Sequence, residues 1–345
     1  MGQGLLANIG ELDTYFRGLH IKKPFLVCGK SAQGTALYRY FEQLEAVPFN
    51  GFAPNPDYGS ALQATSFFRE EGCDCVVGLG GGSALDVAKC VRFWSGAGVP
   101  LIAIPTTAGT GSEATHFAVV YRDGEKTSVS DATCLPDVVL FDPSLLKTLP
   151  AYHRKASMLD ALCHGMESFW SVKATEESRG YAFQAIQGVL SNMGAYLENT
   201  SAGNAGMQQA AYLAGKAINL TQTTAGHAMS YKLTTLYGIA HGHAAALCNA
   251  ALWPYMDRQS GPGLYAVFCR LAKAFGCDTV EDAVAKFQSM VSGLGLGIPR
   301  PSPGDYEVLT GSVNAERLRN NPVPLDMGAI SLLYHQILEG CAVWT

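Results

Sequence analysis

Two pairs of side chains have the types and the spacing of metal ligands. Asp160 and His164 stand four residues apart in the segment DALCH. His227 and His241 stand fourteen residues apart in HAMSYKLTTLYGIAH. Positions four apart share one face of a helix, so Asp160 and His164 can point at one ion. One carboxylate with three imidazoles suits Zn²⁺ or Fe²⁺ better than Ca²⁺ or Mg²⁺, and without a thiolate a structural zinc site is not expected. The alternative is that each of them is an ordinary hydrogen-bonded residue of the core or surface.

Two loops rich in glycine and hydroxyl groups have the composition of a phosphate site. Residues 78–89 read GLGGGSALDVAK, and residues 104–115 read IPTTAGTGSEAT. Glycine lets the backbone come close to a ligand, and the N-terminus of a helix offers N–H groups without intrahelical partners. The first loop lacks the GxGxxG spacing, so a tight turn between a strand and a helix is the alternative. Both loops should lie side by side at the carboxyl edge of a parallel sheet, where nucleotides bind.

The segments that must position these residues change in character near residue 150. Before it, short apolar runs end at Gly, Pro or Asp and alternate with helical stretches, a pattern typical of strands in a buried parallel sheet. The expected strands cover residues 25–28, 75–79, 101–104 and 138–141. After it, long helical patterns dominate. We therefore predict an α/β nucleotide-binding domain with a Rossmann-like parallel sheet over residues 1–150, and an all-α metal-binding domain over residues 151–345.

The composition is typical of a soluble enzyme. The 345 residues carry a net charge of −5 with no block of Lys and Arg, which argues against nucleic acid or an anionic membrane as a partner. Neither a secretory signal nor an apolar run of about 18 residues is recognisable. The ten cysteines are scattered, as expected of reduced, buried thiols. We expect a cytoplasmic protein that acts on a small molecule. No pattern encodes the oligomeric state, and a homodimer is compatible with the sequence.

Five blocks of the sequence resemble the signatures of the iron-containing (group III) alcohol dehydrogenases. In order, they are GGGSALDVAK, PTTAGTGSEAT, DPSLLKTLP, DALCHGMES and HAMSYKLTTLYGIAHGHAAAL. The resemblance, which extends from about residue 25 to the C-terminal end, implies a metal-dependent, NAD(P)H-linked alcohol dehydrogenase or aldehyde reductase. It also implies that one divalent ion, with Fe²⁺ favoured and Zn²⁺ as the alternative, is held by Asp160, His164, His227 and His241.

The same resemblance assigns residues to the cofactor and to catalysis. It implies that the two glycine-rich blocks hold the pyrophosphate and nicotinamide ends of NAD(P). The residues that inherit these contacts are Gly81, Gly82, Ser83, Asp86, Thr106, Thr107, Thr110 and Ser112. Lys126 matches a family lysine that contacts the cofactor, and Asp86 is also a catalytic candidate.

The sequence departs from the family pattern at two positions. Where many members have a histidine that is thought to relay the alcohol proton, this chain has Tyr231. A phenol can pass a proton, but its ordinary pKa near 10 suits it less than imidazole. Where many members have an aspartate that binds the ribose 2′-hydroxyl, this chain has Gly29 followed by Lys30. Without that carboxylate a 2′-phosphate is not repelled, so we predict a preference for NADPH over NADH.

Three segments resemble one subgroup, the phosphonoacetaldehyde reductases. They are RKASMLDALCHGMESFWS, TTAGHAMSYKLT and SVNAERLRNNPV. The resemblance implies reduction of phosphonoacetaldehyde to 2-hydroxyethylphosphonate. Cations that could bind the phosphonate are Arg154, Lys232, Arg317 and Arg319, each of which could equally be a solvated surface charge. The alternatives are another small-aldehyde, diol or glycerol-type dehydrogenase, a dehydroquinate-synthase-like enzyme, and a nucleotide-binding protein without catalysis.

Overall fold

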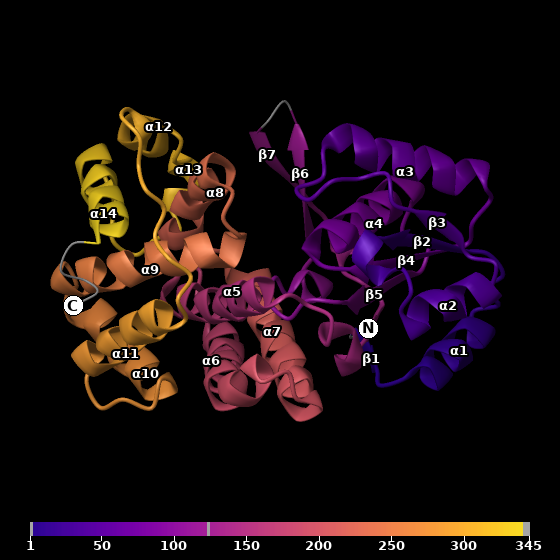
Figure 1. Cartoon of the computed structure of the whole chain (residues 1–345), viewed down its shortest axis with the longest axis horizontal. Helices are drawn as coiled ribbons and strands as arrows, with labels where there is room; N and C mark the ends of the chain where they lie inside the picture. Colours follow the sequence, from indigo (N-terminus) through magenta and orange to yellow (C-terminus); the bar gives the residue numbers. More distant parts are fainter. Residues whose placement is uncertain (1–2, 123–124, 341–345) are drawn as a thin grey trace. The chain divides into compact units, whose positions relative to one another are not determined.

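The computed structural model describes residues 3–122 and 125–340. Three of these residues are described without their side chains: Glu125, Lys126 and Glu316. The chain forms two compact units (Figure 1). The first unit runs to Leu149 and includes Asn199–Gln208, and the second starts at Pro150 and includes the rest.

The first unit is built on a six-stranded parallel sheet with the order β1-β8-β5-β4-β2-β3. Its strands are β1 (Gly4–Leu6), β2 (Pro24–Cys28), β3 (Val47–Phe49), β4 (Cys75–Gly80), β5 (Leu101–Pro105) and β8 (Val138–Leu140). The parallel sheet is as the sequence predicts, and the four expected apolar runs form β2, β4, β5 and β8. A separate antiparallel pair, β6 (Phe117–Arg122) and β7 (Glu125–Ser130), follows β5.

Helices cover both faces of this sheet, which explains why its strands are apolar without alternation. Leu26 and Cys28 lie in one core cluster with residues of α1 (Ile9–Gly18) and α2 (Ala36–Gln43). The intervening side chains of β2 point the other way. There they pack with residues of the two helices on the second face, α3 (Tyr58–Glu70) and α4 (Gly82–Ser95). Figure 1 shows α3 on one side of the strands and α1 and α2 on the other.

The strand order reverses between β2 and β4. From β2 the chain passes to β3 at one edge and then returns to β4 on the other side of β2. Cys28 pairs with Leu79, so the carboxyl ends of the two strands are adjacent. Gly29 follows the first strand and Gly81 follows the second. In open α/β sheets, such a reversal point is where ligands bind.

The second unit is helical, as predicted, and its described residues contain no strand. Its helices are α5 (Ala151–Trp170), α6 (Glu176–Leu197), α8 (Ala225–Tyr237), α9 (His241–Arg258), α10 (Pro262–Ala274), α11 (Val280–Gly293), α12 (Asp305–Gly311), α13 (Ala315–Leu318) and α14 (Met327–Glu339). Helix α7 (Ser201–Thr221) begins in the first unit and ends in the second.

Two helices of the second unit are buried on every side along most of their length. All residues of α5 from Met158 to Trp170 and all residues of α9 from Gly242 to Trp253 are buried. The two helices approach closely at Gly242, where a Cβ atom would lie 2.1 Å from the Ala156 carbonyl oxygen and 2.6 Å from Asp160 Cβ. Only glycine fits there, and the contact brings the first turn of α9 against Asp160.

Candidate metal centre and cofactor loops

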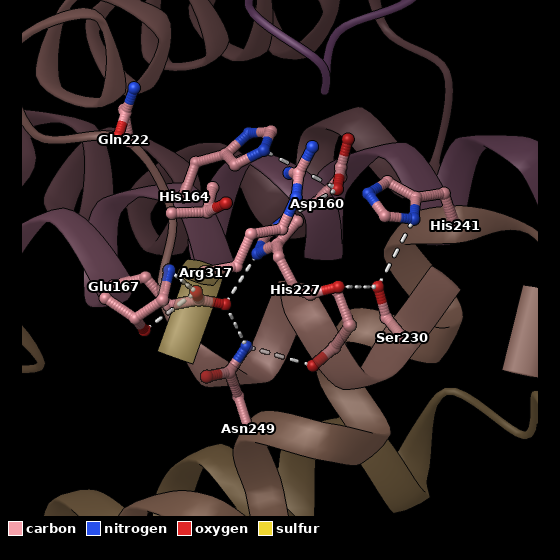
Figure 2. Close-up of polar contacts among 12 residues, drawn as sticks. Asp160, His164, Glu167, Gln222, His227, Ser230, His241, Asn249 and Arg317 are labelled. Atoms are coloured by element: carbon pink, nitrogen blue, oxygen red, sulfur yellow. Dashed lines mark hydrogen bonds and ion pairs between the residues drawn. The ribbon is translucent and has the colours of Figure 1, made fainter. Parts of the chain in front are cut away.

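Asp160, His227 and His241 each direct one ligand atom toward a common region, and these atoms all lie within 4.8 Å of one another. They come from α5, α8 and α9, respectively (Figure 2). Asp160 and His227 are only 3% and 1% exposed, and His241 is half-buried. The Oδ1 atom of Asp160 is 3.4 Å from Nε2 of His227. Ligands about 2.1 Å from one tetrahedral ion stand about 3.4 Å apart, so the residues fit a divalent transition metal.

His164 lies beside this group rather than within it. Its Nε2 atom is 4.0 Å from Oδ1 of Asp160, and its ring stacks on that of His227 with 4.5 Å between the centroids. The 4.0 Å separation is about 0.6 Å longer than the spacing of two ligands on one tetrahedral ion, so His164 could become the fourth ligand only with a shift of that size. Figure 2 shows its ring next to Asp160 and His227.

A second carboxylate, which the sequence analysis missed, lies behind His227. Glu167 is fully buried, and its Oε1 atom is 2.5 Å from Nδ1 of His227 and 2.8 Å from Nδ2 of Asn249. Its position was readable from the sequence, because residues three and seven positions after His164 and Asp160 fall on the same helical face. Carboxylates that accept the second ring N–H of a metal-bound histidine fix its orientation and raise its basicity.

The charges of the candidate centre stabilise one another in the protein without metal. Burial alone would raise the pKa of Asp160, but His164, His227 and His241 lower it below its ordinary value. Burial would likewise raise the pKa of Glu167, but His227 lowers it to about 2. Burial would lower the pKa of His227, but Glu167 and Asp160 raise it to about 10. Both carboxylates are therefore ionised at neutral pH, and in the absence of metal the protonated His227 balances one of their two charges.

Tyr231 and Arg317, both predicted from the sequence, lie next to the same group. The ring of Tyr231 stacks on that of His241, with 5.2 Å between the centroids and an interplanar angle of 5°. Nη1 of Arg317 donates a hydrogen bond to Oη of Tyr231 at 2.9 Å, and the guanidinium carbon is 5.0 Å from the centre of the phenol ring. A phenol and a guanidinium are thus held near the half-buried imidazole.

The other charged candidates have different surroundings. Arg154 is buried, donates to the Tyr196 carbonyl oxygen at 3.0 Å, and stacks its guanidinium 4.4 Å from the Tyr196 ring centre. These contacts tie α5 to α6. Lys232 is half-buried on α8, and Arg319 is exposed after α13. Arg317 is therefore placed beside Tyr231, whereas Arg154 is engaged in helix packing.

In the first unit, the two glycine-rich loops lie against each other. The Thr106 amide donates to the Gly80 carbonyl oxygen at 2.9 Å, which joins the ends of β4 and β5. A Cβ atom on Gly81 would lie 3.3 Å from Thr107 Cγ2, and one on Gly82 would lie 3.1 Å from Cγ2 of Thr110. Helix α4 begins at Gly82, so its N-terminal amides stand at this edge of the sheet. Backbone amides in this position can hold a pyrophosphate.

Asp86 and Ser112 form part of a buried network that supports these loops. The Ser112 hydroxyl donates to Oδ1 of Asp86 at 2.7 Å and accepts from Nζ of Lys89 at 2.8 Å. Lys89 also donates to the Thr115 hydroxyl at 2.9 Å and is fully buried. The network connects α4 to the loop after β5. The sequence analysis did not single out Lys89, although a lysine on the third turn of an apolar helix is a signal for such a network.

Of the remaining cofactor candidates, Ser83, Gly29 and Lys30 follow β4 or β2 at the same edge. Ser83 is half-buried, and its hydroxyl accepts from the Asn55 amide at 3.3 Å. Gly29 is half-buried after β2, and Lys30 is exposed at the start of the short 3₁₀ helix η1 (Lys30–Ala32). Lys126 lies on β7, and its side chain is outside the described part of the structure.

Within residues 3–122 and 125–340, no helix is both long enough and apolar enough to cross a lipid bilayer.

Comparison with known proteins identifies the family. The model of the iron-containing alcohol dehydrogenases matches residues 2–143, and the model of the C-terminal part of the Fe-containing alcohol dehydrogenase family matches residues 155–301. Long-chain-alcohol dehydrogenase 1 of Geobacillus thermodenitrificans is 34% identical over 333 residues, which cover 86% of this chain and 82% of that protein. Phosphonoacetaldehyde reductase of Streptomyces viridochromogenes is 29% identical over 315 residues, covering 81% of this chain and 79% of that one.

A solved structure has the same fold. The crystal structure of sulfoacetaldehyde reductase from Bifidobacterium kashiwanohense in complex with NAD⁺ matches with a TM-score of 0.85 at 24% identity, and the match covers 97% of each chain. The fold and both family models lead to one assignment. The chain belongs to the iron-containing alcohol dehydrogenase family and is an alcohol oxidoreductase.

Proposed function

We propose that the chain is a metal-dependent, NAD(P)H-linked alcohol dehydrogenase that works as an aldehyde reductase. The observation that carries the proposal is the group of buried Asp160, buried His227 and half-buried His241, whose ligand atoms lie within 4.8 Å of one another. These three and His164 would hold one divalent ion, with Fe²⁺ as the first choice and Zn²⁺ as the alternative, since the same donors serve both. The bound ion supplies Lewis-acid polarisation of the substrate carbonyl.

Tyr231 is the proposed proton donor to the substrate oxygen. Its ring is held flat against His241, and its Oη atom accepts a hydrogen bond from Arg317. Because Oη is the acceptor in that bond, Arg317 does not compete for the phenol proton that would be donated. The positive charge of Arg317 also favours the phenolate that remains after proton transfer.

The cofactor would lie along the carboxyl ends of β2, β4 and β5. The amides at the start of α4 suit the pyrophosphate, and the hydroxyl groups of the loop after β5 suit the nicotinamide end. In this proposal Asp86, which accepts from Ser112, keeps that loop in place and contributes to catalysis through it. Lys126 is a further proposed cofactor contact. Because Gly29 offers no carboxylate and Lys30 is exposed beside it, we propose that NADPH is preferred over NADH.

Phosphonoacetaldehyde is the proposed substrate, and 2-hydroxyethylphosphonate the product. Two observations support it: the three sequence segments that resemble this subgroup, and the relative from Streptomyces viridochromogenes that bears this activity in its name. Arg317 would bind the phosphonate, because a guanidinium pairs with such an anion through two parallel hydrogen bonds. Lys232, Arg154 and Arg319 are the other candidates, and the packing of Arg154 against Tyr196 makes it the weakest.

The test is NADPH oxidation by Fe²⁺-loaded protein with a panel of aldehydes. Phosphonoacetaldehyde should be reduced with a kcat/KM at least about 100-fold above that of propanal, because loss of a charged partner costs about 1.5–3 kcal/mol per hydrogen bond. Chelation of the metal should abolish the reaction. A preference for long, uncharged aldehydes would instead favour the second candidate, a long-chain-alcohol dehydrogenase like the relative at 34% identity. No sustained NADPH consumption with any aldehyde would contradict both.

A further inference from the structure

The carboxylate of Glu167 is surrounded by hydrogen-bond donors and is completely withdrawn from solvent. Its Oε1 atom faces Nδ1 of His227 at 2.5 Å and Nδ2 of Asn249 at 2.8 Å. Its Oε2 atom accepts from the Thr224 amide at 2.5 Å and from the Thr224 hydroxyl at 2.8 Å. An ionised carboxylate only accepts hydrogen bonds, and each of these neighbours can donate one. Nδ1 of His227 must therefore carry a proton.

This arrangement fixes the start of α8. Thr224 is the N-cap residue of that helix, yet its side chain makes no capping bond within the helix. Glu167 accepts from the amide of this N-cap residue, as the N3 side chain of a capping box does, and it places a negative charge at the positive end of the helix dipole. Trp170 Nε1 holds the Thr224 hydroxyl from the other side at 3.0 Å. His227, on the first turn of α8, is thereby held at a defined distance from α5.

Asn249 on α9 makes the third contact of the Glu167 carboxylate, after those with Thr224 and His227. A Cβ atom on Gly226 would lie 2.3 Å from Oδ1 of Asn249. The Asn249 side chain therefore fits against the start of α8 only because residue 226 is glycine. Asn249 then donates to both the Ala245 carbonyl oxygen and Glu167. Three helices thus meet at one carboxylate, and Figure 2 shows Glu167 and Asn249 on the side of His227 that faces away from Asp160.

We propose that Glu167 is the positioning residue of the metal centre. It holds the proton of His227 on Nδ1, so that Nε2 faces Asp160 and is available to the ion. It also adds a second negative charge, so that Asp160 and Glu167 together balance one divalent cation. The inference rests on the proposed metal site and adds to it the residue that sets its affinity.

The test is the affinity for Zn²⁺ of the variant Glu167→Gln, measured by competition with a chromophoric chelator at fixed pH. Glutamine preserves the size but offers only one oxygen, so its NH₂ group must face either His227 and Asn249 or Thr224, which are all donors. The dissociation constant should rise by about 10–100-fold. Glu167→Asp, which keeps the charge, should recover part of this loss. Glu113→Gln, at a buried carboxylate in the other unit, should leave the dissociation constant unchanged.

A second readout separates positioning from general packing. The increase in Tm on addition of saturating Zn²⁺ should be smaller in Glu167→Gln than in the wild type. If Glu167→Gln fails to fold, Asn249→Ala, which removes one donor to Glu167, should raise the dissociation constant by up to about tenfold. An unchanged dissociation constant in these variants, with wild-type binding intact, would overturn this inference alone. A wild-type protein that binds no Zn²⁺ or Fe²⁺ would overturn the proposed function as well.

Discussion

The two candidate sites of this chain are built from different parts of the polypeptide. In the first unit, the cofactor loops consist mainly of glycine and small hydroxyl residues, and they pack closely, since a Cβ atom on Gly81 would lie 3.3 Å from Thr107 Cγ2. In the second unit, the candidate metal centre consists of buried or half-buried side chains on three helices. The first site depends on where the backbone turns, and the second depends on how helices pack.

The difference determines what each site needs for support. Amides at the start of α4 are oriented by the helix itself, and the buried hydrogen bonds of Asp86, Ser112 and Lys89 hold the loop after β5. An imidazole can rotate and can carry its proton on either nitrogen, so His227 requires a partner for its second nitrogen, and Glu167 is that partner. We therefore expect substitutions to break the two sites independently.

The largest effect is expected for His227→Ala. The change removes a proposed ligand, so metal retention and aldehyde reduction should fall together by more than the roughly 100-fold that follows loss of a hydrogen-bond partner of a ligand. Binding of NADPH, measured by its fluorescence, should be retained because the cofactor loops belong to the other unit. His153→Ala, at an exposed histidine on the same helix as Asp160, is the matched control. Full activity of a metal-free His227→Ala protein would refute the proposed mechanism.

A second large effect is expected of pH on Zn²⁺ binding at the candidate metal centre, and no such effect is expected at the cofactor loops. Without metal, burial would lower the pKa of His227, but Glu167 and Asp160 raise it to about 10. The ring is therefore protonated at neutral pH, and an ion can bind only after that proton leaves Nε2. The association constant for Zn²⁺ should rise by up to about tenfold per pH unit between about pH 7 and 9. Calorimetry in buffers of different ionisation enthalpy should detect release of about one proton.

The same pKa predicts that the Tm of the metal-free protein and the Tm of the Zn²⁺-loaded protein depend differently on pH. Since the folded pKa of His227 lies above its ordinary value of 6.5, its charge stabilises the metal-free protein fully below that pH, and the contribution is lost as pH rises through about 10. The Tm of the metal-free protein should therefore decline across this range, and that of the Zn²⁺-loaded protein should not. A binding constant independent of pH would show that His227 is neutral before the metal arrives.

The sheet and the cofactor loops follow from the sequence because their determinants are local. A short apolar run that ends at glycine predicts a strand, and parallel strands necessarily bring their carboxyl ends to one edge. The runs at residues 25–28, 75–79, 101–104 and 138–141 predict four of the six strands. The edge strands β1 and β3 are missed because Gly4 and Pro48 interrupt their short apolar runs, whereas β8, of the same length, reads VVL.

The metal centre is predicted only in part, because its geometry depends on packing. The spacing of Asp160 and His164 gives one face of one helix, and His227 and His241 are candidates by type and spacing whose convergence on the same ion is implied by the family resemblance. Glu167 shares a helical face with Asp160 and His164, but this spacing alone does not distinguish it from the solvated glutamates that are usual on helices. Its role arises only when the start of α8 folds against α5. Arg154 illustrates the same limit, because the sequence cannot reveal that its guanidinium is buried on Tyr196.

A smaller effect is expected for Gly242→Ala, which tests whether helix packing positions the ligands. The new Cβ atom would lie 2.1 Å from the Ala156 carbonyl oxygen, so α9 must move away from α5. The free energy of unfolding should fall by about 1–3 kcal/mol, as in overpacked cores, and Zn²⁺ affinity should fall with it. Gly180→Ala is the matched control, because nothing lies within 4 Å of its Cβ position on α6, and it should stabilise the protein by up to about 1 kcal/mol. Equal stability of the two variants would contradict the close contact between α5 and α9.

The smallest effect is expected at the end of β2, where a single exposed side chain is proposed to select the cofactor. Lys30→Ala should lower the ratio of kcat/KM for NADPH to that for NADH by about fivefold, since exposed ion pairs contribute little. The change should appear in the KM for NADPH and leave that for NADH nearly unaltered, because only NADPH carries the 2′-phosphate. Lys22→Ala removes an exposed lysine that precedes β2, at the opposite edge of the sheet, and should leave the ratio unchanged. A ratio that is equal in Lys30→Ala and the wild type would mean that the missing carboxylate at Gly29, rather than the added cation, determines any NADPH preference.

The variant Gly29→Asp decides that case. The backbone of Gly29 has a φ of −78°, and a Cβ atom there would have its nearest neighbour, Ser31 Oγ, at 3.8 Å, so the carboxylate can be added without strain. It should shift the ratio toward NADH.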